Sequence, residues 1–128
     1  MANENIIRCV SKLAAGDLSG NQFYAVYLSA ADTVAVCNGF THDPTGVLRN
    51  KPEAAGRAAE VQRSGEGQIK LGGAVTAGMR LRPTTDGTWI ECPIGWSAFG
   101  EAQEAGAAGE VIRANIFCEG GGAYRLSP

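Results

Sequence analysis

The placement of glycine constrains this chain more than any other feature. The sequence has 18 glycines in 128 residues, about twice the share of an average protein. They concentrate, with alanine, in short clusters at residues 14–16, 54–59, 73–78 and 105–109. The runs between the clusters are rich in β-branched and aromatic residues. Because glycine weakens helices and permits tight turns, this arrangement favours short strands joined by turns.

The predicted strands alternate in polarity or are rich in β-branched residues. They occupy residues 6–13, 22–28, 33–37, 46–49, 59–63, 68–71, 79–82, 88–92 and 110–118. Ser64-Gly65-Glu66-Gly67 predicts a hairpin turn between two of them. Residues 52–60 and 101–105 contain helix formers, but glycine interrupts or ends both, so we expect turns or single helical turns. The sequence therefore predicts an all-β fold, a small β-barrel or sandwich with short helical turns.

One turn-and-strand pattern recurs along the chain. Residues 53–63 align, with one gap, with residues 104–113, and each segment has an Ala-Gly turn before a strand that begins Glu-Val-x-Arg. Similar Ala-Gly turns occur at Ala14-Ala15-Gly16 and Thr76-Ala77-Gly78. Two good copies are too few for a stacked-repeat protein. We interpret the pattern as one kind of turn reused within a single domain, residues 1–128.

Charge and hydropathy exclude several classes of protein. The net charge is −2, charged residues make up 19% of the chain, and no run of lysine and arginine occurs; a general nucleic-acid binder needs such a basic patch. A hydrophobic content of 45% argues against a disordered chain. No segment reaches the ~20 apolar residues of a membrane span, and the N-terminus lacks the pattern of a signal peptide. We expect neither nucleic acid nor a membrane as partner.

The four cysteines do not form a recognisable metal motif. Cys9, Cys37, Cys92 and Cys118 are widely spaced, and His42 is the only histidine. No Cys-x-x-Cys pair is present, so we expect no metal site. Buried free thiols are favoured over disulfides because no sign of secretion accompanies these cysteines.

Catalytic motifs are also missing. Residues 95–100 have one residue too many for a Gly-x-Ser-x-Gly nucleophile elbow. His42 lies in a turn-like segment, where a solvent-exposed side chain is expected. Most of the acidic residues sit beside Gly, Ala or Pro in turns, and no phosphate-binding glycine motif occurs. We therefore expect a protein without enzymatic activity or cofactor.

The aromatic residues and the chain ends offer the candidate contact sites. Core packing is the ordinary role of most aromatics here, since no basic residues are interleaved with them; Trp96 is our best candidate for an interface anchor. The ends form a predicted N-terminal arm, residues 1–7, and a C-terminal tail, residues 119–128. The two ends either stay disordered or become ordered on a neighbouring subunit by adding strands at a sheet edge. Their apolar side chains are Ile6, Ile7, Tyr124 and Leu126.

The order of these segments resembles the capsid decoration, or cement, proteins of tailed bacteriophages. The similarity runs from about residue 1 to residue 117 and rests on a series of short matches. They are Met1–Ile7, Ala14–Leu18, Thr45–Leu48, Pro52–Gly56, Ala59–Val61, Gly67–Lys70, Ala74–Gly78, Asp86-Gly87, Gly95–Phe99, Glu101-Ala102, Gly106–Gly109 and Val111–Ala114. The four cysteines and the aromatic-rich strand at residues 23–27 depart from the family pattern.

The resemblance implies a structural virion protein. Members of that family bind the outer surface of the capsid, stabilise the shell, and usually act as oligomers, commonly trimers. It therefore implies the phage major capsid protein as partner, a homotrimer, and a location on the capsid exterior after synthesis in the bacterial cytoplasm. One alternative is a β-rich virion module that recognises host glycan through an exposed aromatic platform, Trp89 or Trp96. A small cytoplasmic β-barrel enzyme is a weaker alternative.

Overall fold

The fold is built entirely from strands and turns. The computed structural model describes residues 7–38, 43–118 and 124–125. Its strands are β1 (Arg8–Ala14), β2 (Ala25–Ala30), β3 (Thr33–Val36), β4 (Gly46–Leu48), β5 (Ala58–Lys70), β6 (Arg80–Pro83), β7 (Trp89–Glu91), β8 (Ser97–Ala98), β9 (Gly100–Ala102), β10 (Val111–Phe117) and β11 (Tyr124–Arg125). The all-β prediction is confirmed. Residues 52–60 and 101–105 form turns and strand, and these ranges contain no helical turn.

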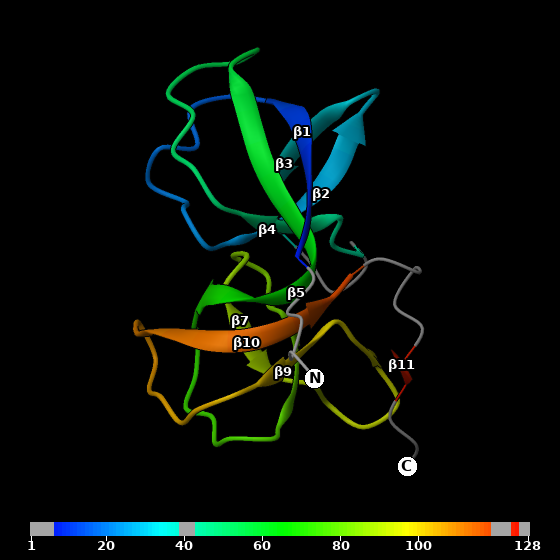
Figure 1. Ribbon diagram of the computed structural model, residues 1–128, viewed down its shortest axis with the longest axis vertical. Coiled ribbons are helices and arrows are strands. Elements are labelled where there is room, and N and C mark those ends of the chain that lie inside the picture. The colour runs from blue at the N-terminus through cyan, green and yellow to red at the C-terminus, as the bar shows by residue number, and fades with distance from the viewer. Residues whose placement is uncertain (1–6, 39–42, 119–123, 126–128) are drawn as a thin grey trace, which may run out of the picture.

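The strands close into two small rings that share β5 (Figure 1). In the first ring the order is β1-β3-β2-β4-β5, and β5 pairs back with β1. In the second ring the order is β5-β10-β9-β6-β7, and a bridge between Trp89 and Leu71 joins β7 to the residue after β5. Small barrels of this kind leave few open edges. The two rings, called here the first and second barrel, lie one above the other in Figure 1.

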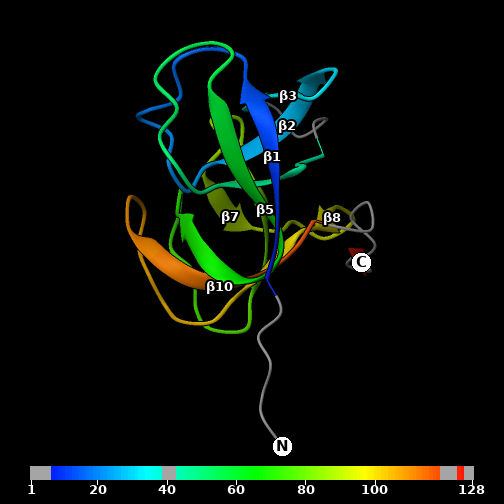
Figure 2. The ribbon, with the colours of Figure 1, turned by 45° about the horizontal axis from the view of Figure 1, so that its top comes forward.

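Strand β5 is continuous where the sequence predicted a hairpin, and that prediction is wrong. Residues 58–64 pair with β1, and residues 64–70 pair with β10. The strand bends at the change of partner instead of reversing, as Figures 1 and 2 show. Gly65 has a φ of +96° at the bend, a conformation that glycine adopts without strain. The Gln62 amide donates to the Ser64 and Glu66 carbonyls at 3.1 and 3.2 Å and fixes the bend from inside.

The Ala-Gly turns share one geometry. In residues 54–57, 76–79 and 107–110, the fourth N–H donates to the first carbonyl at 3.1–3.2 Å, and the third residue is glycine with a φ of +83° to +90°. This combination is typical of a type II turn. The three turns lead into β5, β6 and β10, as the repeated pattern predicted. Ala14-Ala15-Gly16 differs because it follows β1 and its glycine has no positive φ.

The apolar core crosses from one barrel to the other. One cluster fills the first barrel with Ala14, Leu18, Val26, Val34, Leu48, Ala59 and Val61. The other centres on Trp89 and Phe99 in the second barrel, but it also includes Ala25, Cys37 and Val47, which lie on or beside strands of the first. The Ala25 N–H also donates to the Gly87 carbonyl at 2.8 Å. The two barrels therefore share packed side chains as well as a strand.

The predicted strand over residues 22–28 begins only at Ala25. Phe23 precedes it with a φ of +73°, which is rare for a bulky residue. Two hydrogen bonds hold this conformation: the Phe23 N–H donates to the Leu48 carbonyl at 2.7 Å, and the Phe23 carbonyl accepts from the Lys70 N–H at 3.1 Å. Phe23 thus ties β4 to the end of β5. The short strands β8 and β9 were not predicted.

Candidate functional site

The described residues contain no cluster of side chains that could hold a metal ion. No group of three or more metal-ligating side chains occurs among them. On the described part of the chain, one depression of about 410 Å³ lies beside Cys9 and Glu60, and another of about 360 Å³ lies beside Lys51 and Lys70. Neither is lined by two carboxylates or by a histidine; His42 lies outside the described residues. In the part of the chain that the structure describes, no helix is long and apolar enough to cross a membrane.

Three of the four cysteines are buried free thiols, as predicted, and Cys9 is the exception because it is exposed. Burial raises the pKa of Cys37 to about 12 and raises the pKa values of Cys92 and Cys118. A thiol with a raised pKa stays protonated near neutral pH and is a poor nucleophile. The Cys9 thiol accepts a contact from the Arg49 guanidinium at 3.3 Å. The buried thiols serve as core residues.

The clearest exposed apolar feature is the turn between β7 and β8, residues 93–96, called here the tip turn. The Trp96 N–H donates to the Pro93 carbonyl at 3.1 Å, and Gly95 has a φ of +93°. The tip turn therefore has the same geometry as the three Ala-Gly turns. Ile94, at its apex, is 67% exposed, and Trp96 is 40% exposed.

The buried side chain of Arg82 packs against the tip turn. The Arg82 guanidinium carbon lies 5.1 Å from the centre of the Trp96 ring and 5.7 Å from that of Phe99, within the range of a cation–π interaction. Arg82 also donates to the Ser97 carbonyl at 3.1 Å. Burial lowers the pKa of Arg82. The Cys92 thiol donates to the Trp96 carbonyl at 3.4 Å. These contacts fix the indole against the body of the second barrel.

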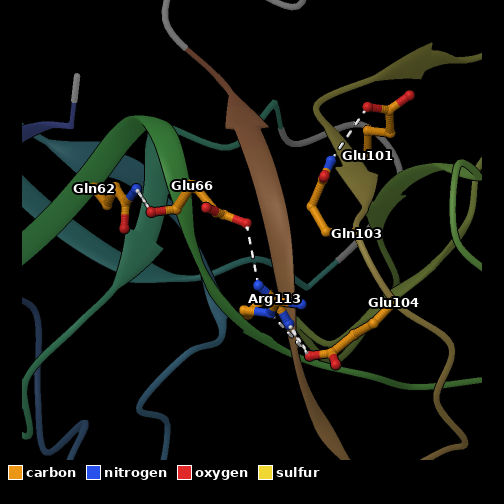
Figure 3. Close-up of polar contacts among 6 residues, drawn as sticks. All are labelled: Gln62, Glu66, Glu101, Gln103, Glu104 and Arg113. Atoms are coloured by element: carbon orange, nitrogen blue, oxygen red, sulfur yellow. Dashed lines mark hydrogen bonds and ion pairs between the residues drawn. The ribbon is translucent and has the colours of Figure 1, made fainter. Parts of the chain in front are cut away.

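A polar network crosses the outer face of β5 and β10 (Figure 3). Arg113 on β10 lies between two carboxylates, 3.8 Å from Glu66 and 3.6 Å from Glu104. Its backbone N–H also donates to Glu104 at 2.9 Å. These side chains are well exposed, and exposed ion pairs contribute about 0–1 kcal/mol. The network braces neighbouring strands and presents no unusual chemistry.

Comparison with known proteins finds similarity among solved structures. No protein-family model matches the sequence, and no curated protein matches it. Among solved structures, the N base of the head fiber protein gp8.5 of bacteriophage phi29 superimposes with a TM-score of 0.68 at 18% sequence identity. The chain has the fold of a phage head-fiber base. The match covers 89% of this chain and 97% of the other, so the shared fold includes both barrels.

The predicted contact residues are placed differently by this fold. Trp96 is on the surface, as an anchor must be. Trp89 is fully buried, so it cannot form the glycan platform that the sequence allowed. The local sequence around Trp89 gave no sign that its side chain would be buried. Ile7 is exposed just before β1. Ile6 and Leu126 lie outside the described residues.

The structure does bring the C-terminal segment close to the tip turn. Tyr124 pairs with Ala98, and Arg125 pairs with Ser97, so β11 lies beside β8, the strand that follows Trp96. The pairing is within one chain; ordering of the tail on a neighbouring subunit stays a prediction. Sequence reasoning missed Ile94. Its signal is the large apolar residue before a turn glycine, at the place where the other turns carry alanine.

Proposed function

We propose that this protein is a non-enzymatic structural protein of a phage virion, which binds the outer surface of the capsid and stabilises the shell. The observation that carries the proposal is the fold shared with a phage head-fiber base over nearly the full length of both chains. The ordered series of Gly- and Ala-rich segments that resembles the capsid decoration proteins supports the same role. The major capsid protein is then the partner.

Binding to a capsid does not require high affinity at any single contact. A shell presents many identical sites, so weak contacts add up when an oligomer binds several at once. A weakly charged surface with many small residues loses little side-chain entropy on binding. A protein that binds the mature shell better than its disrupted state stabilises that shell by mass action.

The proposal includes a homo-oligomer, with a trimer favoured by the resemblance to decoration proteins. Light scattering coupled to size-exclusion chromatography measures the mass of the particle in solution. A mass of three chains of 13.3 kDa is the expected result, and a monomer at micromolar concentration contradicts this part of the proposal.

The direct test of function uses phage heads assembled without this protein. We expect the purified protein to sediment with the heads and to raise the temperature at which they open, followed by release of a DNA-binding dye. Protein that stays in the supernatant at saturating concentration contradicts the proposal. A glycan array with the wild-type protein and Trp96→Ala tests the alternative, which predicts a glycan signal that the substitution abolishes.

A further inference from the structure

We propose that the tip turn is the anchor that attaches this protein to the shell, with Ile94 and Trp96 entering an apolar recess of the capsid protein. This inference rests on the proposed function and adds the contact site to it.

Comparison of the four similar turns shows that Ile94 is not required by the fold. All four have the same hydrogen bond and a glycine with positive φ at the third position. Alanine precedes the glycine in three of them, at Ala55, Ala77 and Ala108, and isoleucine does so only in the tip turn. Among the large apolar side chains of the described residues, Ile94 is the most exposed. The turn does not need this apolar side chain, and the core does not bury it. Its exposure therefore indicates contact with another molecule.

The tip turn is also held in one conformation before any partner binds. Arg82 stacks beneath the Trp96 ring and donates to Ser97, and the Cys92 thiol donates to the Trp96 carbonyl. A rigid aromatic anchor loses little conformational entropy on binding. Tryptophan is also among the residues that contribute most to protein interfaces.

The small contact area of the tip turn decides between two binding partners, a second copy of this chain and the shell protein. An aromatic residue buries roughly 150–250 Å² in a contact, whereas a stable interface buries about 800 Å² on each partner. Two side chains at one turn are therefore too small to hold two copies of this chain together in solution. The same small contact is sufficient on a shell, where several tip turns of an oligomer bind repeated capsid subunits at once. The shell protein fits the site better than a second copy.

The substitution Ile94→Ala tests this inference because it makes the tip turn like its three relatives. We expect unchanged circular dichroism and an unchanged melting temperature, together with at least tenfold weaker binding to heads assembled without this protein, measured by sedimentation. Ile94→Leu, which keeps the apolar volume, should restore most of the affinity. Leu28→Ala is the matched control, since Leu28 is 51% exposed on β2 of the first barrel; its affinity should equal that of the wild type.

The binding and mass measurements separate failure of the anchor from failure of the proposed function. If Ile94→Ala binds heads as tightly as the wild type, the tip turn is not the anchor, while the proposed function stands. If the wild type itself does not bind heads, the proposed function fails and this inference fails with it. If Ile94→Ala lowers the oligomer mass in solution, the occupant is a second copy of the chain, which overturns the assignment to the shell.

Discussion

Gly67 and Gln62 show how single residues decide the path of β5. Gln62 is a buried polar residue, and its amide bonds to two carbonyls at the bend. A Cβ at Gly67 would overlap that amide, with its nearest contact at Gln62 Oε1. The absence of a side chain at residue 67 therefore lets the amide lie against the strand. A buried polar group must be hydrogen-bonded, so the two residues act as a pair.

Gly67→Ala should destabilise the protein because the new Cβ displaces the Gln62 amide. We expect a loss of about 1–3 kcal/mol in the free energy of unfolding, measured by urea titration. Gly20→Ala is the matched control, since nothing lies within 4 Å of a Cβ at Gly20 and its φ is not positive. Equal stability of the two variants would contradict this account of the bend.

Thiol labelling tests the burial of the cysteines. At pH 8 we expect a maleimide to modify only Cys9 in the folded protein, and all four cysteines in denaturant, as counted by mass spectrometry. Rapid modification of Cys37 under native conditions would show that it is not buried.

The raised pKa of Cys37 also predicts how stability changes in alkali. Its ordinary pKa is 9.0, and burial raises it to about 12 in the folded protein. The folded state therefore favours the neutral thiol, and this contribution is complete below pH 9. It is lost as the pH rises from about 9 to about 12, where the unfolded chain ionises first. The melting temperature should fall over that window, and Cys37→Ala should show a smaller fall.

At the scale of elements, the local sequence pattern predicted the Ala-Gly turns better than it predicted the path and pairing of the strands. The Ala-Gly turns depend on one glycine and one short hydrogen bond, so the sequence identified three of them. Ser64–Gly67 permits either a hairpin or a bend, and the choice depends on β1 and β10, which are distant in sequence. The buried position of Trp89 likewise depends on closure of the second barrel. Ile94 was missed because residues 93–96 have no Ala-Gly pair. Their likeness to the other turns was recognised from the shared hydrogen bond and the positive φ of the glycine, and the isoleucine then stands where the other turns carry alanine.

The loop between β6 and β7 gives an electrostatic prediction. The Asp86 carboxylate accepts hydrogen bonds from the hydroxyls of Thr84 and Thr88 and from the Thr88 N–H, and these bonds lower its pKa below 3.8. Asp86→Ala should cost about 1 kcal/mol at pH 7. A lowered pKa contributes stability that is present above the ordinary value and lost as the pH falls through the folded value. The difference from wild type should therefore shrink in acid; a constant difference would contradict the role of the charge.

At the scale of the whole molecule, the shared strand and shared core predict that the two barrels unfold together. Hydrogen exchange should give the same opening free energy for Val26 and Val34 in the first barrel as for Ile112 and Ile116 in the second. Circular dichroism reports on the strands of both barrels, whereas fluorescence from Trp89 and Trp96 reports on the second barrel alone. The two signals should nevertheless give coincident unfolding transitions. Two separated transitions would mean that β5 does not couple them.

The proposed function and the proposed anchor both require that this protein attaches to a phage capsid through its tip turn. A cryo-electron microscopy reconstruction of heads saturated with the purified protein tests this attachment. We expect ordered density for both barrels on the outer surface, with Ile94 and Trp96 against the capsid protein. Heads without added density, or density in which the tip turn faces solvent, would contradict it.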